Sequence, residues 1–220
     1  HEQNVIPGVT VKLAAKSVDK VAISFAGTID YLPQKLRAKC ILTGNPLRES
    51  MLKTSYEKAR RSLKLNEKPF IVMFGGSLGA EKLNETMVEF LNASDTSEFS
   101  FLAGTGEKHY EQIMSKLNKN KLSDSIKIQP YIHNMDTVLP AADLVISRAG
   151  ALTISELAAL GKPSILIPSP YVAHNHQEFN ARAMEKGGAS TVITEAELNA
   201  ATLKEAVDSL VHNRIKRTKM

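Results

Sequence analysis

The 220-residue sequence has one cysteine, no tryptophan, few aromatic residues and no long apolar run. A single cysteine, Cys40, excludes an internal disulfide framework and provides no thiolate cluster for a metal ion. No apolar run approaches the roughly 20 residues of a membrane-spanning helix, and the first residues lack the charged-then-apolar order of a signal peptide. These absences favour a globular, cytoplasmic protein.

Acidic residues are fewer than basic ones, 23 against 28, which gives a net charge of +5. Such a balance suits an anionic partner: a nucleotide, a nucleic acid or an acidic membrane surface. The basic runs, such as "KARRSLKLNEK" and "HNRIKRTKM", contain no interleaved aromatic residues. A base-stacking platform is therefore disfavoured, and we predict no nucleic-acid partner. Contact with an anionic membrane remains open as a minor option.

Several signatures of catalytic chemistry are also missing from the sequence. There is no Asp-x-Asp pair for a phosphate-bridging Mg²⁺, and no cysteine or nearby acidic residue completes a ligand set around His174 and His176. Neither a GxSxG elbow nor a Cys-His-Asn arrangement is visible. We therefore predict no metal and no cofactor, and the catalytic residue stays unknown. A bound anion would have to be neutralised by helix termini and arginine.

From Pro69 onward, short apolar runs alternate with longer amphipathic segments, such as residues 81–93, where the apolar side chains fall on one helical face. Alternation of this kind predicts right-handed crossovers. The expected fold is α/β, a Rossmann-like parallel sheet with helices on both faces. The expected strands are residues 70–74, 99–103, 126–130, 143–147, 164–168 and 190–193.

Residues 1–65 do not continue this pattern cleanly. They predict a helix over 7–19, strands over 20–25 and 38–44, and a polar helix over 50–65. Two strands and one helix cannot make a domain core, so we expect a piece of a longer protein. We divide the chain into a remnant of a preceding domain (1–48), a linker helix between domains (49–65) and a second domain (66–220).

A glycine-rich turn follows the first expected strand of the domain over residues 66–220. Gly75, Gly76, Ser77 and Gly79 precede a helix, and glycines there let backbone N–H groups approach an anion closely. The GGSxG spacing matches the GxGxxG fingerprint of dinucleotide sites only loosely. The alternative is that the glycines merely permit a tight strand-to-helix turn.

The segment 147–163, "SRAGALTISELAALGKP", predicts a second anion site. A helix N-terminus carries roughly half a positive charge and free N–H donors, so it favours a diphosphate without a metal. The donors would come from Ala151, Leu152 and Thr153. Glu156, one turn further, could accept hydrogen bonds from ribose hydroxyls. The alternative is that Thr153 and Ser155 only cap the helix and Glu156 only favours its dipole.

Three further side chains are candidates for ligand contacts. Gln177 and Asn180 lie one turn apart at a predicted helix start, so both amides could face one pocket and bind sugar hydroxyls. Arg48 follows the turn signal Gly44–Pro46 at the domain border. An arginine in an interdomain cleft could bind a phosphate bidentately, although a surface arginine is the simpler interpretation.

Five motifs in order resemble the MurG family of bacterial glycosyltransferases: "HEQNVIPG", "GNPLR", "GGSLGA", "SRAGALTISELAALGKPSILIP" and "NHQEFNA". The resemblance covers nearly the whole chain. It implies transfer of N-acetylglucosamine from UDP-GlcNAc to lipid I (undecaprenyl-pyrophosphoryl-muramoyl-pentapeptide), giving lipid II in peptidoglycan synthesis. It also implies an inverting, metal-free displacement by a cytoplasmic enzyme that lies peripherally on the inner face of the membrane.

In this family two Rossmann-like domains face a cleft, the GT-B architecture. The resemblance therefore implies that residues 1–48 belong to the N-terminal acceptor domain and residues 66–220 are the C-terminal UDP-sugar-binding domain. Because the acceptor loops are absent, the chain is expected to bind the donor without turnover. The alternatives are another UDP-sugar GT-B transferase and a nucleotide-binding module without transfer activity.

Carried onto this chain, the resemblance implies a set of donor contacts. Asn4 would contact the donor sugar, and Arg48 and Ser77 the diphosphate region. Ile132 would meet the uracil through its backbone, and Gln177 would bind the N-acetylglucosamine hydroxyls. The phosphates and ribose would be bound by Ala151, Leu152, Thr153, Ile154, Ser155 and Glu156. Leu78 departs from the family, because related sequences often carry a polar side chain there.

Overall fold

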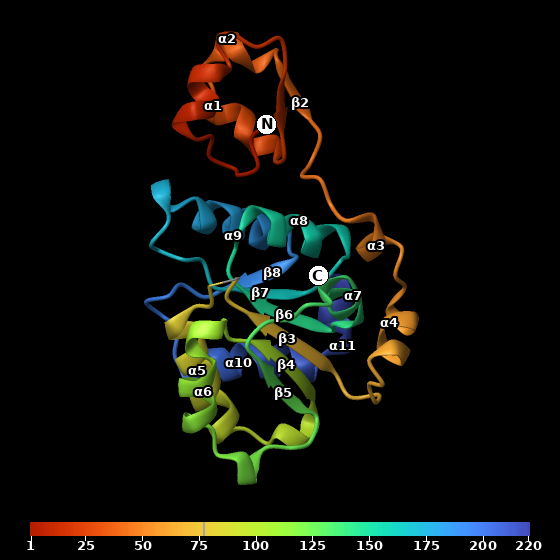
Figure 1. Ribbon diagram of the computed structural model, residues 1–220. Coiled ribbons are helices and arrows are strands. Elements are labelled where there is room, and N and C mark those ends of the chain that lie inside the picture. Colours follow the sequence, from red (N-terminus) through yellow and green to blue (C-terminus); the bar gives the residue numbers. More distant parts are fainter. Residues whose placement is uncertain (77) are drawn as a thin grey trace.

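The computed structural model describes residues 1–76 and 78–220, and Ser77, a predicted site residue, lies outside them. Two units follow each other along the chain (Figure 1). A small unit of residues 1–42 is joined through the irregular segment 43–48 to a larger unit that contains the main sheet. The larger unit holds most of the core.

The larger unit is built on a parallel six-stranded sheet, as the sequence predicted, with the strand order β5-β4-β3-β6-β7-β8. Each of the six predicted apolar runs forms a strand. Their bounds are β3 Phe70–Phe74, β4 Ser100–Gly104, β5 Ile126–Gln129, β6 Leu144–Ser147, β7 Ser164–Leu166 and β8 Ser190–Val192. The central strands are buried on both faces, which explains why their sequences are continuously apolar rather than alternating.

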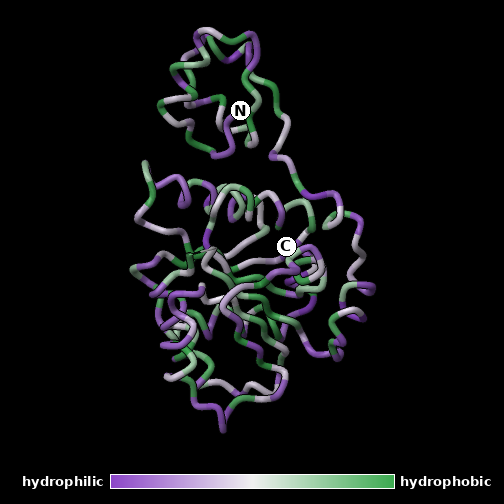
Figure 2. The backbone as a smooth tube through the Cα atoms, in the orientation of Figure 1, coloured by the Kyte–Doolittle hydropathy of each residue, from purple (hydrophilic) through white to green (hydrophobic). Residues whose placement is uncertain are grey.

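Helices cover the sheet on two faces with separate hydrophobic clusters. On one face Ile71 and Ile146 pack against α5 (Glu81–Ala93), α6 (Glu107–Lys116) and α10 (Ala200–Val211). On the other, Val72 and Val145 pack against α7 (Met135–Ala141), α8 (Ala151–Ala159) and α9 (His176–Lys186). Neighbouring strand residues serve opposite faces because strand side chains alternate. Figure 2 shows hydrophilic residues concentrated on the outside of the larger unit.

Helix ends in the larger unit follow the predicted signals. Leu83, Met87, Phe90 and Leu91 of α5 are buried together, which confirms the predicted apolar face. The helix α8 ends before Gly161, and α9 ends before Gly187 and Gly188. The short helix α11 (Arg214–Lys219) follows α10 at the end of the chain.

The small unit has the predicted helix and two strands. The helix α1 (Val9–Ala14) precedes β1 (Val21–Ile23), which pairs in parallel with β2 (Cys40–Leu42). A 3-10 turn over Ala26–Tyr31 and α2 (Gln34–Arg37) connect the two strands. Its buried cluster has four members, Ala15, Val21, Ile23 and Leu36. So small a core agrees with the expectation that these residues do not form a domain core by themselves.

The prediction of one continuous helix over 49–65 is wrong. The segment forms two short helices, α3 (Glu49–Leu52) and α4 (Tyr56–Ser62). The Ser55 hydroxyl accepts a hydrogen bond from the N–H of Lys58 (3.3 Å), so it caps α4. Serine is more favourable at a helix N-cap than in a helix interior, which is why the chain breaks there.

The carboxylate of Asp143 fastens α4 to the main sheet. It accepts hydrogen bonds from the Arg60 guanidinium (2.7 Å), the Tyr56 hydroxyl (2.9 Å) and the N–H of Phe70 at the start of β3 (2.8 Å). The Arg60 and Asp143 side chains are only 12% and 16% exposed. Because a partly buried ion pair with several hydrogen bonds resists separation, α4 belongs to the larger unit.

Candidate functional site

The site lies where the connections of the main sheet change direction. The adjacent strands β3 and β6 are followed by crossovers to opposite sides, β3 leading to β4 and β6 to β7. At such a switch point the loops diverge from the carboxyl ends of the strands and leave a crevice in which α/β domains bind ligands. Residues 75–76 and 78–80 belong to one of the two loops here, and residues 148–150 form the other.

The glycines after β3 are required for two different structural reasons. A side chain on Gly79 would lie 2.1 Å from the carbonyl oxygen of Thr105, and one on Gly75 would clash with Ala80. Both glycines therefore allow tight packing, which supports the turn interpretation for these two. Gly76 has a positive φ of 93° with open space around its Cα. Its backbone is thus the part of the loop that is open to a ligand.

Two cavities border this loop. The larger, of about 620 Å³, extends from Gly76 to Arg148, Ser169 and Gln177. The smaller, of about 170 Å³, is lined by Gly76, Gly104, Gly106, Ile132 and four aromatic or apolar neighbours. The Ile132 side chain is buried, so a contact with a ligand would have to come from its backbone.

The helix α8 begins directly after the loop 148–150, with Gly150 at its N-cap. In the described part of the chain, no side chain accepts a hydrogen bond from the amides of Ala151, Leu152 or Thr153. The capping alternative for Thr153 and Ser155 is therefore not supported. The Ile154 side chain is buried in the core and can offer only its backbone. Unpaired N–H groups at a helix start attract anions.

A charged pair flanks this helix start. The Arg48 guanidinium lies 3.6 Å from the Glu156 carboxylate, and the side chains are 55% and 18% exposed. Burial raises the pKa of Glu156, and the nearby Arg48 opposes that rise. The structure thus brings together Arg48, Glu156 and the α8 amides, which the sequence had assigned to one ligand.

The Ser155 hydroxyl is already occupied within the protein. It donates to the carbonyl oxygen of Ala151 (2.9 Å) and accepts a hydrogen bond from the side-chain amide of Asn45 (2.8 Å). Asn45 also accepts a hydrogen bond from Ser24 of the small unit (2.9 Å). Sequence reasoning saw Asn45 only as a turn residue; its polar neighbours could not be found without the fold.

The predicted role of Asn180 as a pocket-facing amide is wrong. Asn180 is fully buried; its amide donates to Asn4 (3.1 Å) and Ala149 (3.3 Å), and its oxygen accepts the N–H of Val5 (3.0 Å). It is turned toward the core, where it holds the N-terminal segment against α9. Asn4 is accordingly placed beside Asn180 rather than beside Gln177.

Gln177 keeps its predicted position at the start of α9, where it lines the larger cavity. Its side-chain oxygen accepts the N–H of Ser169 (2.9 Å), which fixes the orientation of the amide. The amide nitrogen remains as a donor for a ligand. Arg148, which sequence reasoning named only as a strand exit, forms a buried ion pair with Glu195 beneath this cavity.

The parallel sheet, its switch point and the helices on both faces correspond to the C-terminal half of a GT-B glycosyltransferase fold. Residues 70–220 match the model of the glycosyltransferase family 28 C-terminal domain. The chain belongs to this family.

Sequence relatives agree with this family. The chain is 48% identical over 214 residues to the UDP-N-acetylglucosamine--N-acetylmuramyl-(pentapeptide) pyrophosphoryl-undecaprenol N-acetylglucosamine transferase of Caldanaerobacter subterraneus, covering 96% of this chain and 58% of the relative. It is 49% identical to the enzyme of the same name from Acetivibrio thermocellus, with 100% and 59% covered. The chain therefore spans less than two thirds of the relatives it matches.

Solved structures agree as well. The crystal structure of Acinetobacter baumannii MurG matches with a TM-score of 0.79 and 26% identity, covering 100% of this chain and 60% of that one. The glycosyltransferase of kitacinnamycin matches with a TM-score of 0.67 and 17% identity, with 91% and 48% covered, and this second likeness supports the fold alone. Together with the sequence relatives, the first structure confirms the resemblance to the MurG family.

No helix in the described part of the chain combines the length and the apolar character needed to cross a membrane.

Proposed function

We propose that this chain is the UDP-GlcNAc-binding half of an enzyme that transfers N-acetylglucosamine to lipid I and forms lipid II. The observation that carries the proposal is the meeting of Arg48, Glu156 and the open start of α8 at the switch point of the sheet. Relatives at 48% and 49% identity are named for transfer of N-acetylglucosamine from the UDP-sugar to a pyrophosphoryl-undecaprenol acceptor, which supports the same donor and acceptor here.

The diphosphate of the donor would lie on the α8 amides, with Arg48 beside it. In an inverting displacement, the acceptor's 4-hydroxyl attacks the anomeric carbon while the bond to UDP breaks, and negative charge builds on the leaving diphosphate. A helix start and a guanidinium that are already in place stabilise that charge without reorganisation. They favour the transition state more than the ground state, because the charge is greatest there.

The base, the ribose and the N-acetylglucosamine of the donor would each contact residues on either side of the diphosphate. The small cavity at Ile132 suits a flat base that bonds to the backbone. Glu156 would accept hydrogen bonds from ribose hydroxyls, and Gln177 would donate its free amide nitrogen to the sugar. Ser77 would contribute to the diphosphate region, and Asn4 would reach the sugar from the small unit.

The acceptor and the cellular location are part of the same proposal. Lipid I is anchored in the membrane, so an enzyme that uses it works at the cytoplasmic face as a peripheral protein. The net charge of +5 favours such a surface when the lipid is anionic.

Titration calorimetry with UDP-GlcNAc, UDP, UDP-galactose and ADP-ribose tests the proposal directly. UDP-GlcNAc and UDP should bind, UDP-galactose should bind more weakly than UDP-GlcNAc, and ADP-ribose should give no measurable heat. Equal affinity for ADP-ribose would contradict a uridine site. Equal affinity for the two UDP-sugars would contradict recognition of N-acetylglucosamine and favour another UDP-sugar transferase.

A further inference from the structure

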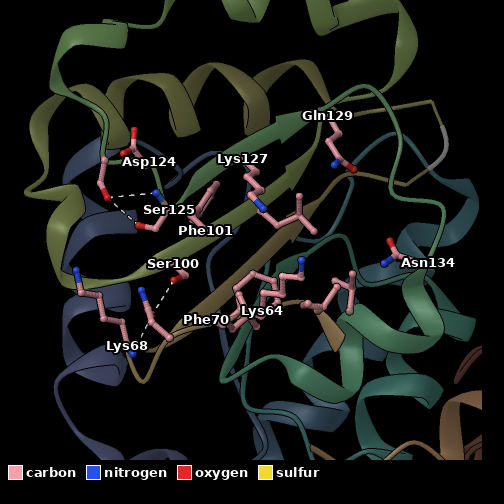
Figure 3. A pocket seen from close by; sticks show the side chains of 16 residues that line it. Lys64, Lys68, Phe70, Ser100, Phe101, Asp124, Ser125, Lys127, Gln129 and Asn134 are labelled. Carbon is pink, nitrogen blue, oxygen red and sulfur yellow. Dashed lines mark hydrogen bonds between the residues drawn. The ribbon is translucent and has the colours of Figure 1, made fainter. Parts of the chain in front are cut away.

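A second cavity, of about 440 Å³, lies away from the switch point, on the sheet face above β4 and β5 (Figure 3). Its apolar floor consists of the buried Phe70, Leu102 and Val138 together with Leu63 and Leu65, which are partly exposed. The segment 63–68, between α4 and β3, forms one wall, and Asn134 at the start of α7 closes one end. None of the residues proposed to bind UDP-GlcNAc lines this groove.

Positive charge surrounds the groove. Lys64, Lys68 and Lys127 line it, against a single acid, Asp124. Among the described residues, no ion pair involves any of the three lysines. Figure 3 shows the amino groups of Lys64 and Lys127 directed into the same space between the wall and β5. Two unpaired ammonium groups that share one space repel each other unless an anion lies between them.

The backbone of Lys64 adopts a conformation that a residue with a side chain rarely has. It follows α4 with a φ of 53°, and the N–H of Leu65 donates to the carbonyl oxygen of Arg60 (3.0 Å). This is the left-handed position after a helix, where glycine is strongly preferred because it has no Cβ. Lysine there costs stability, yet it directs its amine into the groove.

The other end of the groove offers uncharged hydrogen-bonding groups. The side-chain amides of Gln129 and Asn134 line it and form no side-chain hydrogen bond within the described residues. The hydroxyls of Ser123 and Ser125 instead bond to each other (2.8 Å). The groove therefore combines a cationic centre, an apolar floor and two free amides.

We propose that this groove binds a small phosphate monoester that carries an apolar body. The phosphate would lie between Lys64 and Lys127, where its two negative charges match two unpaired cations. The apolar body would cover Leu63 and Leu65, the apolar lining residues that are partly exposed. The inference does not depend on the proposed donor site, because the two sets of residues are separate.

The probe is 1-naphthyl phosphate. The control ligands are 1-naphthol, which has only the apolar part, and inorganic phosphate, which has only the charged part. Calorimetry on the whole chain, saturated with UDP to occupy the donor site, should show binding of 1-naphthyl phosphate and much weaker binding of either half. Amide resonances of Leu102, Lys127 and Asn134 should shift in NMR spectra, with the start of α8 unaffected. The same NMR shifts should appear without UDP. They would then support this groove even if the chain did not bind UDP at the proposed donor site.

Two variants and a matched control complete the test. Lys127→Ala and Lys64→Gly should each weaken 1-naphthyl phosphate about tenfold, the loss expected for one charge-assisted contact. Lys64→Gly should also raise the melting temperature by about 2–4 °C, because glycine relieves the left-handed backbone. Lys58→Ala, an exposed lysine on α4, should change neither quantity.

Three outcomes would overturn the proposal. The first is unchanged affinity in both Lys64→Gly and Lys127→Ala. The second is inorganic phosphate binding as tightly as 1-naphthyl phosphate, because the apolar floor would then contribute nothing. The third is displacement of the probe by UDP, which would place it in the crevice beside α8.

Discussion

The side-chain amide of Asn45 donates a hydrogen bond to the Ser155 hydroxyl over 2.8 Å and joins residues 110 positions apart. Three residues later, Arg48 meets Glu156, the neighbour of Ser155, at 3.6 Å. The two contacts lie side by side and hold the segment 43–48 against the first turns of α8. Asn45 therefore positions Arg48, although no contact between Asn45 and the ligand is proposed.

Asn45→Ala should weaken UDP binding about tenfold, because Arg48 loses the contact that fixes it beside the phosphates. Calorimetry with UDP measures the effect. Thr43→Ala is the control, since the Thr43 hydroxyl is exposed and donates only to the adjacent Gly44. Equal affinity in Asn45→Ala and wild type would show that Arg48 is positioned by other contacts.

Glu156→Gln should weaken UDP binding by about 1–3 kcal/mol, the usual contribution of a hydrogen bond to a charged group. The substitution keeps the shape of the side chain, so calorimetry reports the loss of the charged acceptor. Glu49→Gln is the control, because that carboxylate pairs only with Lys53 on the surface. An unchanged titration would contradict the ribose contact.

The same variant should not lower the stability of the unliganded chain. Burial raises the pKa of Glu156, so ionising it in the folded state costs free energy above that pKa, and the cost is relieved as pH falls through it. Glu156→Gln should thus unfold at equal or higher urea concentration at neutral pH, and the difference should vanish in acid. A less stable variant at neutral pH would contradict this sign.

Gln177→Ala should impair UDP-GlcNAc binding and leave UDP binding nearly unchanged, because the free amide nitrogen is assigned to the sugar alone. Calorimetry with both ligands separates the two effects. Gln112→Ala on α6, an exposed side chain, should alter neither affinity. Equal losses for both ligands would instead mean that Gln177 acts by holding Ser169 and the shape of the cavity.

Lys162 should make stability rise with pH in the alkaline range. Its amine donates to the carbonyl oxygens of Pro140 (2.6 Å) and Ala142 (3.0 Å), and burial lowers its pKa from 10.5 to about 8, with Asp143 opposing. Between these values the unfolded chain holds a proton that the folded chain has released, so the free energy of unfolding increases with pH.

Urea unfolding of wild type and Lys162→Met checks that prediction. The stability of wild type relative to the variant should increase from about pH 8 to about pH 10. Lys53→Met, which removes a surface lysine paired within α3, should show a flat difference over the same range. A flat difference for Lys162→Met as well would show that the folded lysine keeps its proton.

Periodicity predicted the strands from Phe70 onward, because a parallel strand buried on both faces must be continuously apolar. The start of α8 could be predicted equally well, since a glycine before a helix start is a local feature. The break at Ser55 was missed because helical periodicity outweighed one capping residue. The local sequence pattern therefore predicted which helices and strands form, but it predicted their first and last residues less well.

Contacts across the sequence could not be predicted in the same way. Gln177 and Asn180 share a helix turn, yet one faces the cavity and the other is buried against Asn4, and only the packing of the small unit decides this. The partnership of Asn45 with Ser155 likewise depends on how the chain returns over α8. The partners of side chains that bond to a distant segment cannot be predicted from the neighbouring residues in the sequence.

Because Asp143 clamps α4 to β3, any reorientation of residues 1–42 relative to the sheet must be absorbed by the irregular residues 43–48. That short stretch also carries Asn45 and Arg48. A swing of the small unit would thus move the Arg48 guanidinium relative to Glu156 and the start of α8, so that the pivot and the arginine proposed to bind the diphosphate are on one piece of chain.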